Sequence, residues 1–326
     1  MLTLTKVLLA MMAGFVASVL FGWVIVPFLK KIKFRQRISI FVGENHQKKS
    51  GTPTMGGFIF ILPTLLITSY LLLTKKIEFN YDLTITLFVF VSYAFLGFLD
   101  DYISIKKGRN QGLTISQKFL GQTIIALVFF ALFMKYNGDT RLIVTSLGIN
   151  IDLKWFYGVF VLLLLVGFSN AVNLTDGLDG LSGGLSAFAF IAFALIALFA
   201  GYYDMGIFCF ILIGSLLGFL MFNSYPAKIF MGDTGSLCLG ATLATVAILT
   251  RREVTLFVVA FVFLIETLSA MLQIYWVRRK HKKLFLMAPL HHHFEKMGWS
   301  EPDIVKLFWV GGIIFAMLGI FFAVWI

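Results

Sequence analysis

The sequence predicts an all-α polytopic membrane protein with about ten transmembrane helices. Hydrophobic residues make up 59% of the 326 positions and charged residues only 13%, whereas a soluble domain has roughly 25% charged residues. The mean hydropathy is +0.92. The apolar runs are long and uninterrupted, while strands of a membrane barrel alternate over roughly ten residues. We therefore expect one integral-membrane domain over residues 1–326.

Ten segments approach the ~20 apolar residues that a helix needs to cross a bilayer. They cover residues 7–29, 57–74, 83–99, 117–134, 156–172, 184–201, 205–222, 236–250, 254–277 and 304–326. The first is too long for the hydrophobic core of a signal peptide, so we expect it to be retained. Cys209 and Cys238 lie in or beside these spans without a pairing pattern and are expected to pack as small apolar residues.

The distribution of positive charge predicts the orientation of these spans. Nineteen of the 27 Lys and Arg residues lie after the first, third, fifth, seventh and ninth spans, and eight lie on the other side. The positive-inside rule then places both termini outside the cytoplasm. On that outer side, the segment 135–155 has β-branched runs around two glycines and predicts a small hairpin. Topology and lipid headgroups account for the net charge of +11, so no nucleic acid partner is expected.

Five acidic residues lie at the ends of spans on the predicted cytoplasmic side. They are Asp100 and Asp101 in FLGFLDDY, Asp176 and Asp179 in NAVNLTDGLDG, and Asp233 in KIFMGDTGS. Carboxylates are costly near a bilayer, and clustered ones indicate a function. They share this face with most of the lysines and arginines. The pattern is typical of a membrane enzyme that binds Mg²⁺ and a diphosphate.

Two of these acidic motifs also have simple structural explanations. Adjacent residues on a helix point about 100° apart, so Asp100 and Asp101 are expected to have different roles, unless they only form a solvated helix end. Asn173, Asp176 and Asp179 recur every three residues and would share one helix face. Asn and Asp at the end of a span are also common helix caps and turn formers.

Asp233 lies where the eighth span begins at the predicted cytoplasmic surface. A helix N-terminus favours anions, and a plain Asp cap would explain the residue. A Mg²⁺ ligand explains it better, because Mg²⁺ binds one or two carboxylates together with substrate phosphates. Lys228 and Phe230 lie just upstream, where they suit charge contact and base stacking.

Two further segments complete this face. Residues 48–57 form a basic, glycine-rich entry to the second span, without the GK[ST] ending of a Walker A loop. His291, His292 and His293 precede the last span. Consecutive histidines cannot all turn toward one metal ion, so phosphate or sugar contact, or proton transfer, fits them better than zinc. Residues 300–303 match a capping box for the last span.

Glu266 is the one acidic residue well inside a span. Gln273 lies seven residues further on, close to the same helix face. Glu266 either forms hydrogen bonds within the bundle or lines the cleft, and the sequence leaves both alternatives open.

In combination, GTPTMGG, FLDDY, NAVNLTDGLDG, NSYPAKIFMGDTG and PLHHHFEKMGW closely resemble the phospho-N-acetylmuramoyl-pentapeptide-transferase family, one of the polyprenyl-phosphate N-acetylhexosamine-1-phosphate transferases. The resemblance covers essentially the whole chain. It implies transfer of phospho-MurNAc-pentapeptide from UDP-MurNAc-pentapeptide to undecaprenyl phosphate, giving lipid I and UMP in peptidoglycan biosynthesis. It also implies Mg²⁺, an active site on the cytoplasmic face of the bacterial plasma membrane, contact with membrane lipid, and a homodimer.

The resemblance assigns roles to individual residues. It implies that Asp233 is the Mg²⁺ ligand and that Asp100 and Asp101 form the acidic pair at the reaction centre. The other catalytic residues that it implies are Asn173, Asp176, His291, His292 and His293. The substrate-binding residues that it implies are Lys49, Thr54, Gly177, Leu178, Asp179, Asn223, Phe230 and Gln273.

The chemistry favours direct attack over an aspartyl-phosphate intermediate. A phosphate monoester has a second pKa of ~6, so the lipid phosphate is mostly dianionic at neutral pH and needs no strong base. Asp100 would remove a residual proton or orient the acceptor. Two other classes remain: a sister GlcNAc-1-phosphate transferase, which GTPTMGG and HHHFE argue against, and a transporter, whose coupling sites would lie near the bilayer midplane.

Overall fold

The computed structural model describes residues 2–32, 51–108, 112–136, 138–144 and 148–324. The helices in these residues are α1 (Leu2–Lys31), α3 (Phe58–Leu73), α4 (Tyr81–Lys107), α5 (Ile115–Tyr136), α6 (Trp155–Thr175), α7 (Leu181–Phe199), α8 (Tyr203–Asn223), α9 (Gly232–Leu249), α10 (Glu253–Val259), α11 (Phe261–Lys280), α12 (Leu290–Lys296) and α13 (Glu301–Val324). The strands are β1 (Arg141–Val144) and β2 (Ile149–Asp152).

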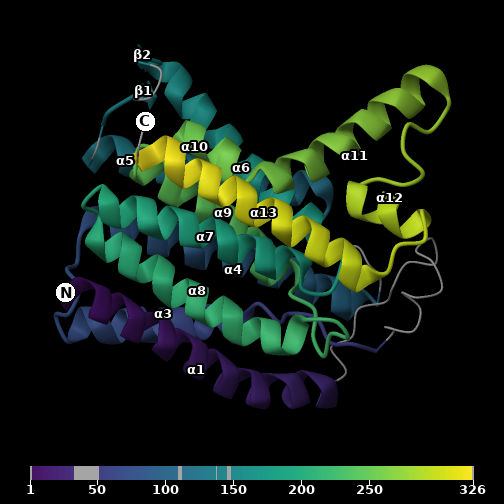
Figure 1. The fold of residues 1–326 in the computed structure, drawn as a ribbon, viewed down its shortest axis with the longest axis horizontal. Helices are drawn as coiled ribbons and strands as arrows, with labels where there is room; N and C mark the ends of the chain where they lie inside the picture. Colours follow the sequence, from purple (N-terminus) through teal and green to yellow (C-terminus); the bar gives the residue numbers. More distant parts are fainter. Residues whose placement is uncertain (1, 33–50, 109–111, 137, 145–147, 325–326) are drawn as a thin grey trace.

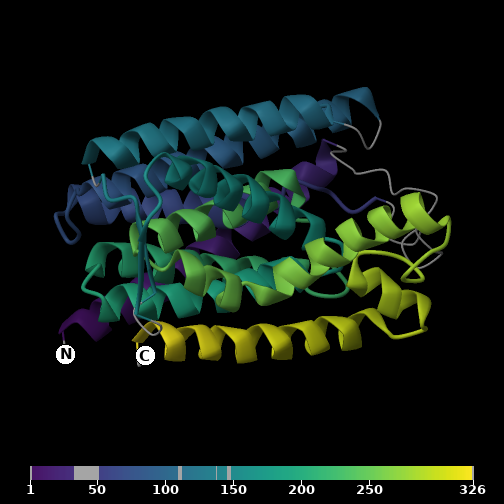
Figure 2. The same ribbon diagram turned by 90° about the horizontal axis from the view of Figure 1, so that it is seen from above.

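The all-α polytopic class that the composition predicts is confirmed. Within the described residues, nine helices are long and apolar enough to cross a membrane, and the sixteen-residue α3 is a shorter apolar helix. The long helices run back and forth along one bundle axis, and both chain termini lie at the same end of it (Figures 1 and 2). The opposite end carries α12 and the C-terminal end of α11.

The predicted span 254–277 is wrong as a single helix. The chain forms α10, leaves helical geometry at Ala260 with φ −98° and ψ 23°, and begins again as α11. Val259 packs tightly against Gly319 of α13, where an added Cβ would lie 2.2 Å from the valine Cγ2. This contact holds α10 in the bundle, and α11 then turns away from the other helices (Figure 1).

The core of the bundle surrounds α9. Every residue of α9 from Thr234 to Leu249 is buried, and its neighbours include α4, α6 and α7. A helix that is apolar on all sides belongs in an interior of this kind. Close approach depends on small residues: a Cβ at Gly214 of α8 would lie 1.9 Å from the carbonyl oxygen of Met11 in α1. Such contacts are typical of helix packing in membranes.

A small antiparallel sheet lies at the end of the bundle that holds both termini (Figure 1). Arg141 of β1 pairs with Asp152 of β2. The guanidinium of Arg251 donates to the carbonyl oxygens of Asp139 and Arg141, both at 2.6 Å, and so ties the sheet to the end of α9. The hydrogen bond from the Arg141 side chain lowers the pKa of Asp139. That this end faces the outside of the cell stays a prediction.

Candidate active site

The N-terminus of α9 is capped by an acidic side chain from α4. One carboxylate oxygen of Asp101 accepts from the backbone N–H of Asp233 at 3.2 Å, and the other accepts from the N–H and the hydroxyl of Thr234 at 3.0 and 2.6 Å. Asp101 therefore satisfies donors that a helix start leaves open. Both of its oxygens are engaged in holding α9 in place.

The carboxylate of Asp233 lies where side chains from α5 and α6 meet. Its Oδ1 accepts from the Nδ2 of Asn173 at 2.8 Å, and its Oδ2 is paired with the ammonium of Lys118. The same ammonium donates to the Oδ1 of Asn173 at 3.3 Å, and the amide of Asn173 also donates to Ser236 at 2.8 Å. Asp233, Lys118 and Asn173 thus form one hydrogen-bonded cluster.

Asp100 lies directly beside this cluster. Its carboxyl group interacts with that of Asp233, and its Oδ1 accepts from the backbone N–H of Leu113 at 3.0 Å. A Cβ at Gly112 would lie only 2.2 Å from the carbonyl oxygen of Asp100, so this approach requires a glycine. Asp100 and Asp101 therefore make different contacts, because one interacts with Asp233 and the other caps α9. That they have different roles in a reaction stays a prediction.

The remaining acidic residue of the site follows the end of α6. Burial, together with the smaller effects of the carboxylates of Asp233, Asp101 and Asp179, raises the pKa of Asp176 to about 8. Several carboxylates therefore lie in one region. The ammonium of Lys118 pairs with one of them, that of Asp233. Their mutual repulsion favours entry of a cation.

Two motifs that are far apart in the sequence are joined by backbone hydrogen bonds beside the site. The N–H of Phe230 donates to the carbonyl of Pro53 at 2.8 Å, and the N–H groups of Gly56 and Gly57 donate to Phe230 and Met231 at 2.8 and 2.9 Å. The start of α3 is thereby joined to the start of α9.

Thr54 lies within this junction and is buried. Its hydroxyl has no hydrogen-bond partner among the described residues. A Cβ at Gly232 would lie 2.7 Å from that hydroxyl oxygen and 2.5 Å from Oδ2 of Asp101. The tight turn at Gly232, with φ +74°, therefore needs a residue without a side chain.

The first histidine of the triple motif is held by Glu266. The carboxylate accepts from the backbone N–H of His291 at 3.1 Å and contacts its Nδ1 at 2.8 Å, and both residues are fully buried. Glu266 therefore bonds within the bundle, which decides between the two alternatives left by the sequence. The Nε2 of His291 has no partner within the described residues and faces Gly177, where an added Cβ would lie 2.4 Å away.

The three histidines have three separate partners. The Nδ1 of His292 contacts Glu295 at 2.6 Å. The Nδ1 of His293 accepts from the backbone N–H of Leu286 at 3.1 Å. The three Nδ1 atoms therefore bind three different groups, while the rings of His291 and His292 lie close together, with their centroids 4.2 Å apart.

The residues expected in the nucleotide pocket fall into two groups. Asp179 and Asn223 are buried where the turn before α7 meets the segment before α9: the Asp179 carboxylate accepts from Ala227 at 2.9 Å, and Asn223 accepts from Gly180 at 3.1 Å and donates to Ile229 at 2.9 Å. Leu178, also buried, and Gly177 lie in the same turn. Phe230 is partly buried beside them.

Gln273 lies apart from that group, on α11. Its side chain accepts from Leu284 and Phe285 at 3.0 and 2.9 Å and donates back to Phe285 at 3.1 Å. It thereby fastens the segment that leads to α12. Lys49 lies outside the described residues.

The residues of the site fit Mg²⁺, which shares its ligands among protein, water and substrate, better than a metal ion bound only by protein side chains. Within the described part of the chain, no three His, Cys, Asp or Glu side chains are grouped so that they could bind a metal. Mg²⁺ needs only one or two carboxylates, because water and substrate phosphates complete its shell. Asp100 and Asp233 lie side by side and provide that pair.

Sequence reasoning missed three residues that the site uses. Lys118 counted only as one of many cytoplasmic cations, yet it pairs with Asp233. Ser236 binds Asn173, and Glu301 accepts from the backbone N–H of Asp179 at 2.7 Å. Lys118 begins a span on the same side as the acidic motifs, which was the one signal available.

One half of the predicted capping box is confirmed, since the Ser300 hydroxyl oxygen accepts from the backbone N–H of Asp303 at 3.3 Å.

Comparison with known proteins agrees with this geometry. The model of glycosyl transferase family 4 matches residues 83–251, the part of the chain that contains Asp100, Lys118, Asn173 and Asp233. Phospho-N-acetylmuramoyl-pentapeptide-transferase of Bacillus subtilis (strain 168) is 48% identical over 320 residues, which cover 98% of each chain. The proteins of the same name from Geobacillus thermodenitrificans and Halalkalibacterium halodurans are 48% and 44% identical, again over 98% of each chain. This chain therefore belongs to the phospho-N-acetylmuramoyl-pentapeptide-transferase family.

Proposed function

We infer that this chain transfers phospho-MurNAc-pentapeptide from UDP-MurNAc-pentapeptide to undecaprenyl phosphate, giving lipid I and UMP in peptidoglycan biosynthesis. The family membership supports the reaction. The structural observation that carries it is the convergence of Asp100, Lys118, Asn173 and Asp233 from four helices at one end of the bundle. At a membrane boundary of this kind, a soluble nucleotide and a lipid phosphate can both reach the same side chains.

The proposed mechanism is direct attack by the lipid phosphate on the diphosphate. Phosphoryl transfer depends on positioning and on charge stabilisation more than on covalent help. Lys118 supplies a positive charge next to the reacting groups, and Asn173 orients Asp233 by a hydrogen bond at 2.8 Å. Asp101 keeps the N-terminus of α9 in place. Asp100 removes a residual proton from the acceptor phosphate or orients it.

Mg²⁺ would be held by Asp233, with Asp100 beside it. When bound, it would polarise the diphosphate and stabilise the departing UMP. Lys118 pairs with Asp233 in the structure, so its ammonium is the group that must move when a cation binds that carboxylate.

We also propose that the active site faces the cytoplasm and that the enzyme is a homodimer. The excess of Lys and Arg on the active-site side supports the orientation. The homodimer rests on the family resemblance, and mass photometry of the detergent-solubilised protein tests it.

Each alternative class has a specific argument against it. A transporter is disfavoured because its coupling sites would lie near the bilayer midplane on broken helices, whereas these carboxylates lie at helix ends on one side. A GlcNAc-1-phosphate transferase is disfavoured by the identity of 44% to 48% over nearly the whole chain to transferases of the muramoyl-pentapeptide donor. Competition between the two UDP-sugars would separate the two transferases.

The test is release of UMP from UDP-MurNAc-pentapeptide by the purified protein, with undecaprenyl phosphate, with and without Mg²⁺. We expect Mg²⁺-dependent release, and we expect Asp233→Ala to abolish nearly all of it with normal expression. Asp152→Asn, at the far end of the bundle, is the matched control and should behave like the parent. No release with Mg²⁺ would refute the function, whereas an Asp233→Ala variant with half the parent rate and the same Mg²⁺ optimum would refute only the metal role.

A further inference from the structure

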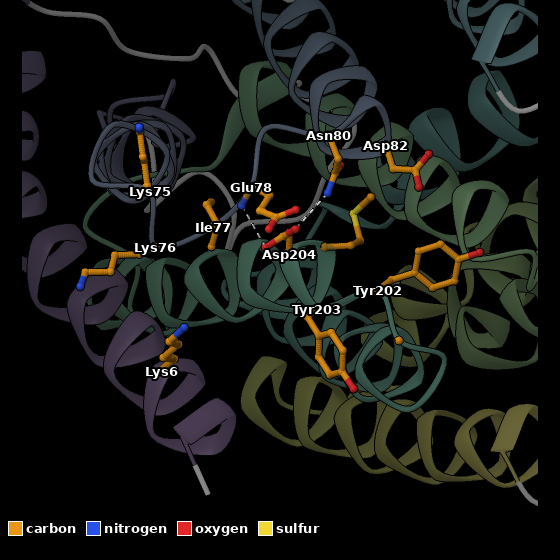
Figure 3. A pocket seen from close by; sticks show the side chains of 12 residues that line it. Lys6, Lys75, Lys76, Ile77, Glu78, Asn80, Asp82, Tyr202, Tyr203 and Asp204 are labelled. Carbon is orange, nitrogen blue, oxygen red and sulfur yellow. Dashed lines mark hydrogen bonds between the residues drawn. The ribbon is translucent and has the colours of Figure 1, made fainter.

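A cavity of about 530 Å³ lies at the end of the bundle opposite the active site. It is formed by the start of α1, the turn between α3 and α4, and the start of α8 (Figure 3). The polar side chains that matter here are Lys6, Lys76, Glu78, Asn80 and Asp204. None of them has a role in the proposed reaction.

The cavity contains both signs of charge, and the two signs are separated. Lys6, Lys75 and Lys76 lie on one side, the carboxylates of Glu78 and Asp204 lie next to each other at the centre, and Asp82 lies on the far side (Figure 3). Among the residues that the structure describes, neither Lys6 nor Lys76 forms an ion pair with Glu78 or Asp204. A ligand that carries one positive and one negative group would match both sides at once.

The acidic side of the cavity is a defined structure. Asp204 accepts from the backbone N–H of Glu78 at 3.3 Å and from the Nδ2 of Asn80 at 3.0 Å. Asn80 in turn caps α4 by accepting from the N–H of Leu83 at 2.8 Å. The carboxylate of Asp204 is thus held by the turn that leads into α4, and it retains lone pairs for a further donor.

Exposed aromatic side chains lie beside the cavity. Phe79, Tyr81 and Tyr203 are exposed, and the ring of Tyr81 stacks on Tyr136 at 3.9 Å between centroids. Trp and Tyr gather at the boundary between hydrocarbon and water in membrane proteins. Such surroundings suit the headgroup of a lipid in the leaflet distant from the active site.

We propose that this cavity binds the headgroup of a zwitterionic phospholipid of the phosphatidylethanolamine type. Its phosphate contacts Lys6 and Lys76, and its ammonium donates to Glu78 and Asp204. An ammonium has three N–H donors, whereas the trimethylated nitrogen of choline has none and a glycerol headgroup has no positive charge. The site therefore distinguishes ethanolamine from both.

The experiment uses the full-length protein in detergent and three short-chain lipids with identical tails, namely phosphatidylethanolamine, phosphatidylcholine and phosphatidylglycerol. Native mass spectrometry measures the affinity for each. Lys76→Gln tests the phosphate side and Glu78→Gln tests the ammonium side. Lys135→Gln, an exposed lysine at the same end outside the cavity, is the matched control. UMP release by each variant shows that the protein is folded.

We expect the parent and the control to prefer the ethanolamine lipid over the other two by about tenfold, the size of one hydrogen bond to a charged group. Lys76→Gln should weaken binding of all three lipids. Glu78→Gln should remove the preference for ethanolamine while UMP release stays unchanged. Equal binding of the three lipids by the parent, or an ethanolamine preference that survives Glu78→Gln, would overturn the proposal. Tightest binding of the glycerol lipid would replace it with a site for anions.

Discussion

Lys118 changes how the acidic site is understood at the scale of single residues. Its ammonium pairs with Asp233 and donates to Asn173 at 3.3 Å. The site therefore has one positive charge beside its carboxylates, and transfer of a phosphoryl group is expected to need further positive charge. Burial, and after it the nearby carboxylates, raises the pKa of Asp176 to about 8. A cation that entered this group of carboxylates would lower their mutual repulsion and add positive charge for a phosphate.

Asp100→Asn tests the role of Asp100 as a proton acceptor. Near pH ~6 about half of the lipid phosphate keeps its second proton, which Asn cannot accept, so the deficit in rate should be larger there than at pH ~8. As the pH rises above ~6–7 the dianion forms and the variant should recover part of the loss. UMP release between pH ~5.5 and ~8.5 measures this. A deficit that does not change with pH would leave Asp100 with an electrostatic or positioning role, and a phospho-sugar trapped on the enzyme would contradict direct attack.

Glu266→Gln tests whether Glu266 positions His291. A carboxylate only accepts hydrogen bonds, so the Nδ1 that contacts it at 2.8 Å carries a proton, and the Nε2 on the other side of the ring faces Gly177. The side-chain amide of Gln has only one oxygen, which the backbone N–H of His291 would occupy. Its NH₂ group would then donate to Nδ1 and favour the tautomer with the proton on Nε2. We expect kcat to fall by about tenfold or more, as for loss of acid–base catalysis, together with a changed pH profile.

A double-mutant cycle separates this role from a structural one. In a His291→Ala background, Glu266→Gln should cost little more, because the group that it orients is already absent. Additive losses, with an unchanged pH profile, would show that Glu266 acts only through packing.

At the scale of elements, the site depends on how closely α4 approaches α9. Gly97 of α4 lies against the start of α9, where an added Cβ would be 2.1 Å from the carbonyl oxygen of Asp233. One turn further along α4, Asp101 caps the same helix start. Both contacts are needed to bring Asp100 next to Asp233, because these side chains belong to different helices.

Gly97→Ala should therefore separate the two helices. We expect loss of most of the activity and a destabilisation of about 1–3 kcal/mol, the usual range for overpacking. Thermal unfolding and UMP release measure the two effects. Gly167→Ala is the matched control: this glycine of α6 has open space around its Cβ position, and Ala is favoured over Gly within a helix. Equal behaviour of the two variants would contradict the close-packing argument.

At the scale of the whole molecule, the two ends of the bundle differ in content. One end carries the acidic cluster, Lys118 and the histidine helix α12, and the other carries both termini, the small sheet and the mixed-charge cavity (Figures 1 and 3). The outer helices α1, α5, α11 and α13 expose most of their apolar residues, as expected for contact with lipid tails. The orientation of these ends across the membrane stays a prediction from the distribution of charge.

Labelling of single cysteines tests that orientation. Cys209 and Cys238 are both buried, so the parent should react slowly with an impermeant maleimide. On intact cells, Ile151→Cys in the exposed part of β2 should be labelled and Lys283→Cys, before α12, should not. After permeabilisation both should react. The reverse pattern would place the active site outside the cytoplasm.

The sequence by itself determined the membrane class and, apart from the break at Ala260, the positions of the spans. It also predicted that the acidic motifs gather at one end of the molecule. Hydropathy is a local property of the sequence, so the spans can be read from it directly. Because each span returns the chain to the opposite side of the membrane, the number of spans between two motifs predicts whether they share a side. It predicts one side for Asp100, Asn173, Asp176 and Asp233. Only the tertiary structure decided which of these groups touch. The pairing of Lys118 with Asp233, the hold of Glu266 on His291, the capping of α9 by Asp101 and the break at Ala260 all depend on contacts between elements far apart in the chain. Such contacts follow from how small residues let helices approach, and that packing leaves no periodic signal in the sequence.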